Sequence, residues 1–402
     1  MTCNRLSKAR VADLHSTMSG YVERGDMPGI VTLIGRGEEV HVDAIGMKTV
    51  TGSEAMRRDT IFRIASITKP ITAAATMILV DDAKLRLDDV VDRWLPELAN
   101  RRVLERIESP LDDTVPATRP ITVRDLLNST FGFGSVMSMP GSCPIQQPIK
   151  EGQLGGDGPP HPSLTPGTDE WMRRLGALPL MYQPGERWAY NTSCDVLGVL
   201  IARVAGTSFE AFLQQRLFDP LGMKDTAFSV PALQVHRLAG IYQFNHGSRR
   251  LVEFDDSRNS EYGRPPAFES GAGGLVSTVD DYHAFCRMML NKGVMGSERL
   301  LSLTSVDAMT HDQLTPAQRQ GAGIFFGNHS SWGFGMAVNI HRDQPWTVPG
   351  RFGWDGGFGT SAYSDPTHDF IGILFTQRLM DSPQPPAVFR DFWMHAYRAL
   401  EG

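Results

Sequence analysis

Ser66 and Lys69 lie three residues apart in the stretch RIASITKP, which runs from Arg63 to Pro70. Side chains three residues apart face the same way on a helix, so a helix beginning here would bring a hydroxyl and an amine together. A serine hydroxyl becomes a good nucleophile when a nearby base takes its proton, and a lysine can be that base once burial disfavours its charged form. The alternative is an ordinary helix start, in which Ser66 caps the helix and Lys69 faces solvent.

The residues that follow predict a helix from about Ser66 to Asp82. Pro70 is tolerated in a first turn, where the backbone amides are unpaired in any case. Those amides also favour negative charge that develops nearby. The chain contains no GxSxG nucleophile elbow, which argues against an α/β-hydrolase with a Ser, Asp and His triad. A serine hydrolase with this sequence would therefore have to use Lys69.

The composition limits the other classes of function. The chain has 402 residues, of which 41% are hydrophobic and 21% charged, with a net charge of -6 and no block of basic residues. Neither nucleic acid nor an anionic membrane is an expected partner. The first residues lack a continuous apolar run and no later segment is long enough to cross a bilayer, so a soluble, cytoplasmic protein is expected.

No metal, nucleotide or other cofactor is expected either. The chain has no HExxH, GxGxxG or Walker motif. Its four cysteines are scattered without CxxC spacing, which predicts free, mostly buried thiols rather than a zinc site or a disulfide framework. They are Cys3, Cys143, Cys194 and Cys286.

The order of the elements predicts one sheet built from both ends of the chain. Residues 6–24 have helical spacing, and residues 29–46 read as two strands joined by a glycine turn. A mainly helical region follows, and strand patterns return from about residue 270 before a last helix at 386–400. An isolated hairpin is marginal, so the early and late strands must share a sheet. The Gly- and Pro-rich segment at about 134–168 is expected to be a long lid or rim loop.

A lysine base needs a partner that holds its amine and relays the proton, and Tyr190 is the candidate. It lies in PGERWAYNTSCDVLG, after a turn and just before a helix. Together with SITK, this stretch resembles the serine β-lactamase-related hydrolases, the group of class C β-lactamases, DD-peptidases and family VIII carboxylesterases. ESGAGGLVSTVDDYHAF (269–285) and GWDGGFGTSAYSDP (353–366) are similar to further segments of that family, in the same order.

The resemblance implies a β-lactamase/transpeptidase-like fold of the α/β (α+β) class, with an antiparallel sheet flanked by helices. The whole chain, 1–402, would form one catalytic domain. Its α/β lobe would comprise about 1–85 and 270–402, and its mainly helical lobe about 86–269. The active site would lie where the two lobes meet.

The resemblance also implies roles for individual residues. Ser66 would be the acylated nucleophile, Lys69 its base, and Tyr190 the group that protonates the leaving group. The backbone amides of Ser66 and Gly357 would form the oxyanion hole, although Gly357 also fits an ordinary turn. Expected substrate contacts are Trp354, Asp355, Gly356, Thr192, Phe131 and Phe133.

Some of these positions have an equally good structural explanation. The Thr192 hydroxyl fits a structural role equally well. Phe131 and Phe133 fit packing in the core equally well. Asp195, at the start of a helical run, is expected to cap the helix or form a salt bridge rather than take part in chemistry.

The segment 353–366 departs from the pattern of the penicillin-recognising enzymes in the family. Those enzymes place a lysine or histidine where this chain has Trp354, followed by Asp355 and Gly356. An aromatic ring followed by an anion favours an uncharged, apolar group over a carboxylate. The leading hypothesis is an esterase acting through an acyl-enzyme on small, short-acyl esters. The alternatives are a β-lactamase or D-amino-acid peptidase, an acyltransferase, and a non-catalytic binding protein on the same fold. The sequence leaves the oligomeric state open.

Overall fold

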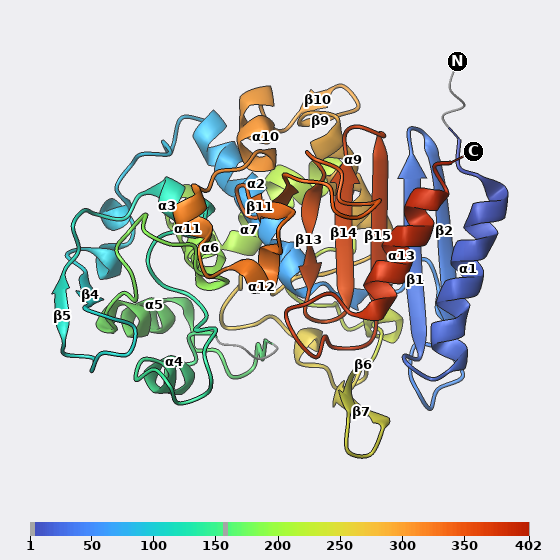
Figure 1. The fold of residues 1–402 in the computed structure, drawn as a ribbon, viewed down its shortest axis with the longest axis horizontal. Coiled ribbons are helices and arrows are strands. Elements are labelled where there is room, and N and C mark those ends of the chain that lie inside the picture. Colours follow the sequence, from blue (N-terminus) through green and yellow to red (C-terminus); the bar gives the residue numbers. More distant parts are fainter. Residues whose placement is uncertain (1–4, 156–159, 402) are drawn as a thin grey trace.

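Strands from both ends of the chain form one seven-stranded antiparallel sheet, as expected (Figure 1). The computed structural model describes residues 5–155 and 160–401. The strand order is β11-β12-β13-β14-β15-β1-β2, so the last strand of the sequence, β15, pairs with the first, β1. In that pair Leu33 lies opposite Ile373. The expected fold class is therefore confirmed.

The strands of the main sheet follow the segments predicted from the sequence. They are β1 (Gly29–Arg36), β2 (Glu39–Gly46), β11 (Ser330–Trp332), β12 (Ala337–Asn339), β13 (Phe352–Gly356), β14 (Thr360–Asp365) and β15 (Phe370–Thr376). Four two-stranded pairs complete the β structure: β3 (Phe62–Arg63) with β8 (Val276–Ser277), β4 (Arg102–Leu104) with β5 (Thr114–Pro116), β6 (Ile241–Asn245) with β7 (Arg250–Asp255), and β9 (Val294–Met295) with β10 (Glu298–Arg299).

Helices flank the sheet and fill the middle of the sequence. They are α1 (Lys8–Glu23), α2 (Thr68–Asp81), α3 (Val123–Leu127), α4 (Gln146–Glu151), α5 (Thr168–Ala177), α6 (Thr192–Ala205), α7 (Phe209–Leu213), α8 (Asp219–Leu221), α9 (Val279–Leu290), α10 (Leu303–Thr310), α11 (Pro316–Arg319), α12 (Gly323–Phe326) and α13 (Ala387–Arg398). A short 3-10 turn, η1 (Ala65–Ile67), leads into α2.

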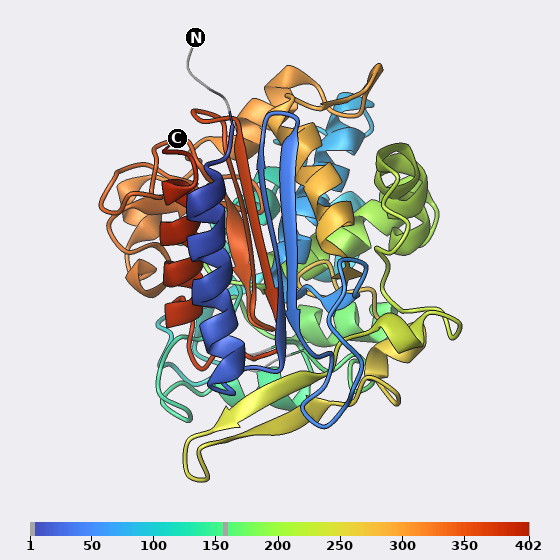
Figure 2. The ribbon, with the colours of Figure 1, turned by 90° about the vertical axis from the view of Figure 1, so that its right-hand side faces the viewer.

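The central strands are buried on both faces because each face packs against its own helices. Along β1, Ile30 and Ile34 contribute to one core cluster, whereas Val31 and Leu33 contribute to another. This alternation follows from the two-residue period of a strand. Figure 2 shows α1 and α13 side by side on one face of the sheet. Residues of α2 and α9 belong to the core cluster on the opposite face. Within this sheet, β13 lies against η1, the turn that leads into α2.

The middle of the chain contains more β structure than expected. Both the β4–β5 and the β6–β7 pairs lie within the region predicted to be mainly helical. The segment predicted to be one long loop contains a helix, α4. Residues 156–159 of this segment lie outside the described part. The loop begins beside the predicted site, since the Ser135 amide donates to the Tyr190 carbonyl at 2.8 Å. The lobe boundaries stay a prediction.

Three of the four cysteines are buried and free, namely Cys143, Cys194 and Cys286, whereas Cys3 lies outside the described residues. Within residues 5–155 and 160–401, no single helix has the length and apolar character needed to cross a membrane. One sharply bent pair, Thr192–Ala205 with Phe209–Leu221, meets that test of length and composition only when its two parts are taken together.

Candidate active site

Ser66 lies in the 3-10 turn η1, immediately before α2. The preceding residue, Ala65, has φ of 46°, a left-handed conformation that is costly for a residue other than glycine. The N-cap of α2 is Ile67, and no side chain caps that end. Ser66 is therefore not a helix cap, and its side chain is partly exposed. Lys69 lies in the first turn of α2 and is 1% exposed.

The Ser66 hydroxyl lies between Lys69 and Tyr190. The distance from Ser66 Oγ to Lys69 Nζ is 2.9 Å, and to the Tyr190 phenol oxygen 2.8 Å. Lys69 Nζ also lies 3.2 Å from that phenol oxygen. All three groups are thus within hydrogen-bond distance of one another, which is the geometry that an activated nucleophile requires.

Lys69 is held without a carboxylate partner. Besides the two hydroxyl oxygens, its Nζ donates to the backbone carbonyl of Ala272 at 2.7 Å and lies 4.6 Å from the centre of the Tyr190 ring. Among the described residues no acidic side chain forms a salt bridge with it. Its three hydrogen bonds therefore go to the oxygens of two side chains, Ser66 and Tyr190, and to one backbone carbonyl.

Tyr190 is positioned by the backbone before α6 and by aromatic neighbours. The next residue, Asn191, has φ of 83°, so a second strained position adjoins the centre. The Trp354 indole donates to the phenol oxygen of Tyr190 at 3.0 Å. The ring of Phe325 packs on that of Tyr190 with centroids 4.7 Å apart, and Trp188 packs on it at 5.7 Å. Two N–H groups, from Lys69 and Trp354, thus point at the phenol oxygen and stabilise negative charge on it.

The end of β13 approaches the turn that carries Ser66. A Cβ atom added to Gly356 would lie 2.5 Å from the Ile64 carbonyl oxygen and 3.4 Å from the Ser66 amide nitrogen, so this position accepts only glycine without rearrangement. Gly357 is exposed, and a Cβ there would meet nothing within 4 Å. Neither the Ser66 nor the Gly357 amide donates to the backbone of another described residue. Both amides are available to a substrate oxygen.

Asp355 faces away from this centre, which corrects the expectation that it contacts substrate. Successive residues of a strand point to opposite faces, and Trp354 takes the face toward Tyr190. The Asp355 carboxylate instead accepts from the Ser361 hydroxyl at 2.6 Å, and that hydroxyl also accepts from the Trp393 indole of α13. Although the residue keeps some exposure, burial of its carboxyl raises the pKa of Asp355 to about 6.

Four other predicted contact residues are covered by protein. Phe131 and Phe133 have no exposed surface and lie in the large core cluster, so the core-packing alternative describes them. Thr192 is 3% exposed in the first turn of α6, which agrees with a structural role. Trp354 is 6% exposed because Phe325 and Trp332 pack against it. Its indole donates to Tyr190 and offers little surface to a substrate.

Three contributors to the site were not predicted from the sequence. The Ala272 carbonyl is a backbone group and has no side-chain signature, although it lies in the 269–285 segment that carried the family resemblance. Phe325, partly exposed on the short helix α12, lies outside the segments that resemble the family's motifs. Asp195 holds the segment of Ala272 through hydrogen bonds to Ser270 and to the Ala272 amide.

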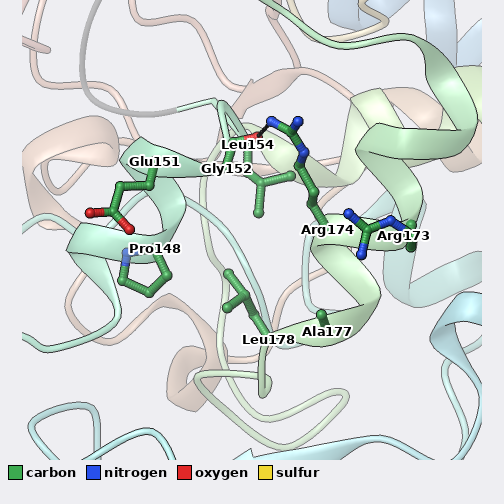
Figure 3. Close-up of a pocket in the computed structure, with 8 residues that line it drawn as sticks. All are labelled: Pro148, Glu151, Gly152, Leu154, Arg173, Arg174, Ala177 and Leu178. Carbon is green, nitrogen blue, oxygen red and sulfur yellow. Dashed lines mark hydrogen bonds between the residues drawn. The ribbon is translucent and has the colours of Figure 1, made fainter.

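A separate hollow of about 350 Å³ lies between α4 and α5, away from the Ser66 centre (Figure 3). Its two arginines, Arg173 and Arg174, both pair with Glu170, and Arg174 also donates to the Gly152 carbonyl. Both guanidinium groups therefore already have a carboxylate partner within the protein, which they share. In the described ranges, no group of three or more His, Cys, Asp or Glu side chains is placed to hold a metal ion.

Comparison with known proteins finds relatives along most of the chain. The model of the Beta-lactamase family matches residues 14–389. Protein Rv1367c of Mycobacterium tuberculosis is 37% identical over 375 residues, which cover 89% of this chain and 88% of that protein. Esterase EstB of Burkholderia gladioli is 29% identical over 382 residues, again with 89% and 88% covered.

The fold is also found among solved structures. EstCE1, described as a hydrolase with promiscuous acyltransferase activity, superimposes with a TM-score of 0.81 at 23% identity, covering 97% of this chain and 99% of its own. At that identity the likeness shows the shared fold. Because the family model spans nearly the whole sequence and a relative is 37% identical over 89% of it, the chain belongs to the Beta-lactamase family.

Proposed function

We propose that the protein is a serine hydrolase that acts through an acyl-enzyme on small, uncharged carboxylic esters. The observation that carries this proposal is the meeting of Ser66 Oγ, Lys69 Nζ and the Tyr190 phenol oxygen within 3.2 Å of one another. Membership of the Beta-lactamase family and the likeness to Esterase EstB support serine hydrolase chemistry.

In the first half of the proposed reaction, Ser66 Oγ attacks the ester carbonyl carbon. Its proton passes to the uncharged amine of Lys69, or to the Tyr190 oxygen when the phenol has already given its own proton to that amine; both atoms lie within hydrogen-bond reach of Ser66 Oγ. The negative charge on the carbonyl oxygen is stabilised by the amides of Ser66 and Gly357. Tyr190 then protonates the departing alcohol, and the acyl group remains on Ser66.

In the second half, water takes the place of the alcohol. The same Lys69 and Tyr190 pair removes a proton from the water, which attacks the acyl carbonyl and releases the acid. The proton returns to Ser66 Oγ, so the centre ends in its starting state. If an alcohol takes the place of water at this step, the same centre transfers the acyl group instead.

The preference for uncharged esters rests on the aromatic surroundings of the centre. Phe325, Trp188 and Trp354 all pack on the Tyr190 ring, and the partly exposed Phe325 offers an apolar surface beside the nucleophile. Penicillin-recognising enzymes carry a cation at the position of Trp354. Here the indole of Trp354 occupies that position and donates to Tyr190. Asp355 contributes nothing to this preference, because its carboxylate is on the other face of the strand.

The test compares kcat/KM for p-nitrophenyl butyrate and for nitrocefin, in wild type and in Ser66→Ala. Wild type should prefer the ester, and Ser66→Ala should lose turnover of both while keeping the wild-type circular dichroism spectrum. Retained turnover in Ser66→Ala contradicts the nucleophile, and a wild-type preference for nitrocefin contradicts the substrate class. A butyryl ester of an added alcohol among the products would identify acyl transfer.

A further inference from the structure

The buried side chain of Asp195 is connected to Lys69 by two hydrogen bonds that meet at Ala272. Asp195 is 5% exposed in the first turns of α6, five residues after Tyr190. Its Oδ1 accepts from the Ser270 hydroxyl at 2.6 Å and from the Ala272 amide at 3.0 Å. The carbonyl of that same Ala272 accepts from Lys69 Nζ at 2.7 Å. One residue of the chain therefore connects the carboxylate to the lysine.

The segment that carries Ala272 is fixed from two sides. From α2, the Thr72 hydroxyl donates to the Gly271 carbonyl at 2.7 Å. From α6, the Cys194 carbonyl lies so close to Gly271 that an added Cβ would approach it to 2.2 Å. Asp195 is the side chain of α6 that hydrogen bonds to this segment, and α6 also begins directly after Tyr190. The same helix start thus sets the position of the phenol and, through residues 270–272, of the acceptor for the lysine.

We propose that Asp195 is a positioning residue for the Ser66 reaction: as a double hydrogen-bond acceptor, it holds the 270–272 segment so that the Ala272 carbonyl directs Lys69 Nζ at Ser66 and Tyr190. This inference rests on the proposed Ser66 chemistry. It assigns a role in that reaction to Asp195, a residue that the sequence predicts only to cap a helix or form a salt bridge.

The role belongs to the acceptor oxygen and not to a full negative charge. Both of its partners are donors, a hydroxyl and an amide, and no cation forms a salt bridge with Asp195 among the described residues. Burial raises the pKa of Asp195, which favours the neutral form. The titratable and charged groups around Lys69 are Tyr190, Asp195 and the buried thiol of Cys194. An amide side chain, which keeps one acceptor oxygen, should therefore replace the carboxyl.

The experiment measures how fast a fluorophosphonate labels Ser66 in the full-length protein, by intact mass, together with kcat and KM for p-nitrophenyl butyrate. Asp195→Ala should slow labelling about a hundredfold, as expected for a misplaced catalytic group, and should lower kcat far more than it changes KM. Asp195→Asn should recover at least about a fifth of the wild-type rate, because a hydrogen bond of this kind is retained. Ser270→Ala, which removes one of the two donors, should slow labelling about three- to tenfold.

Asp281 supplies a matched control for loss of stability alone. It is also a buried aspartate, with an oxygen that accepts from the Asp225 amide at 2.7 Å and from the Thr226 hydroxyl at 2.9 Å. Asp281→Ala should lower Tm about as much as Asp195→Ala but leave the labelling rate of folded protein within about threefold.

The possible failures can be told apart. If Asp195→Ala is labelled at the wild-type rate, or if Asp195→Asn is as slow as Asp195→Ala, the positioning role is wrong. If Asp195→Ala does not fold, Ser270→Ala decides: an unchanged rate there contradicts the proposal. If Ser66→Ala is labelled like wild type, the proposed function itself fails, independently of Asp195.

Discussion

The two faces of strand β13 carry opposite kinds of chemistry. On one face, Trp354 donates to the Tyr190 phenol and packs against Phe325, so the surroundings of the nucleophile are aromatic. On the other face, Asp355 accepts from Ser361 beneath α13, where the Arg351 guanidinium packs on the rings of both Tyr363 and Trp393.

This difference shows how two adjacent residues can serve separate purposes. Because side chains alternate along a strand, the carboxylate of Asp355 lies on one face while the neighbouring Trp354 donates to the Tyr190 phenol on the other. On the other face, no acidic side chain of the described residues pairs with Lys69, and the polar contacts of the centre are hydroxyls, one indole and one carbonyl. Changes on the two faces should therefore affect different properties, activity on one and stability on the other.

The largest expected effects are on the catalytic face, at Lys69 and Tyr190. Lys69→Ala and Tyr190→Phe should each lower kcat/KM for p-nitrophenyl butyrate by about 10²- to 10⁴-fold, because each removes a proton-transfer group. The double variant should be little slower than the slower single variant, since groups that act as a unit do not add. Losses that multiply in the double variant would show that the two residues act separately.

A smaller effect is expected where β13 meets the nucleophile turn. Gly356→Ala places a methyl group against the Ile64 carbonyl and beside the Ser66 amide, so the free energy of unfolding should fall by roughly 1 to 3 kcal/mol. Turnover should fall about ten- to a hundredfold as the oxyanion amides shift. Gly357→Ala is the matched control for stability, because its methyl group meets no protein atom within 4 Å and should leave the free energy of unfolding nearly unchanged. Equal losses of stability in the two variants would contradict the close approach at Gly356.

The indole N–H of Trp354 should contribute a more modest amount. Trp354→Phe removes its hydrogen bond to Tyr190, which should lower kcat about two- to tenfold for a bond worth about 0.5 to 1.5 kcal/mol. Trp332→Phe is a fitting comparison, since the neighbouring indole is buried and its N–H has no partner within the described ranges. If both substitutions lower kcat equally, packing and not the hydrogen bond explains the loss.

The smallest effect on activity is expected from Asp355→Asn on the structural face. Burial raises the pKa of Asp355 from 3.8 to about 6, so between about pH 4 and 6 the unfolded chain loses this proton before the folded protein does. The wild-type free energy of unfolding therefore falls as the pH rises through this window. Above the window, the stability lost by ionising Asp355 stays constant.

Asp355→Asn lacks this titration. Its stability relative to wild type should rise by about 1 to 3 kcal/mol between pH 4 and 7, while kcat/KM at pH 7 changes less than about threefold. Urea unfolding at the two pH values measures the first quantity. A stability difference that does not depend on pH would mean that Asp355 titrates normally.

The elements and the central residues were readable from the sequence because their signals are local. Strand and helix periods predicted the sheet from both chain ends, and the serine-three-lysine spacing predicted Ser66 and Lys69 on one side of a helix start. The opposed faces of Trp354 and Asp355 also follow from strand alternation, which is incompatible with the expectation that both side chains contact substrate.

The other differences depend on tertiary packing. Phe131 and Phe133 follow a helix end, a position compatible with either a pocket or the core, and only the packed structure places them inside. The Ala272 carbonyl has no residue-type signature, so neither it nor the role of Asp195 behind it was predictable. Phe325 reaches Tyr190 across 135 positions of sequence, a contact that no local pattern encodes.

The central claim, that Ser66 is the nucleophile, is tested most directly by covalent labelling. The intact mass of the wild-type protein is measured after incubation with a fluorophosphonate, and the modified peptide is then mapped. A single adduct on the peptide that contains RIASITKP, absent in Ser66→Ala, is the predicted result. An unlabelled wild-type protein, or an adduct on another peptide that persists in Ser66→Ala, would contradict the account.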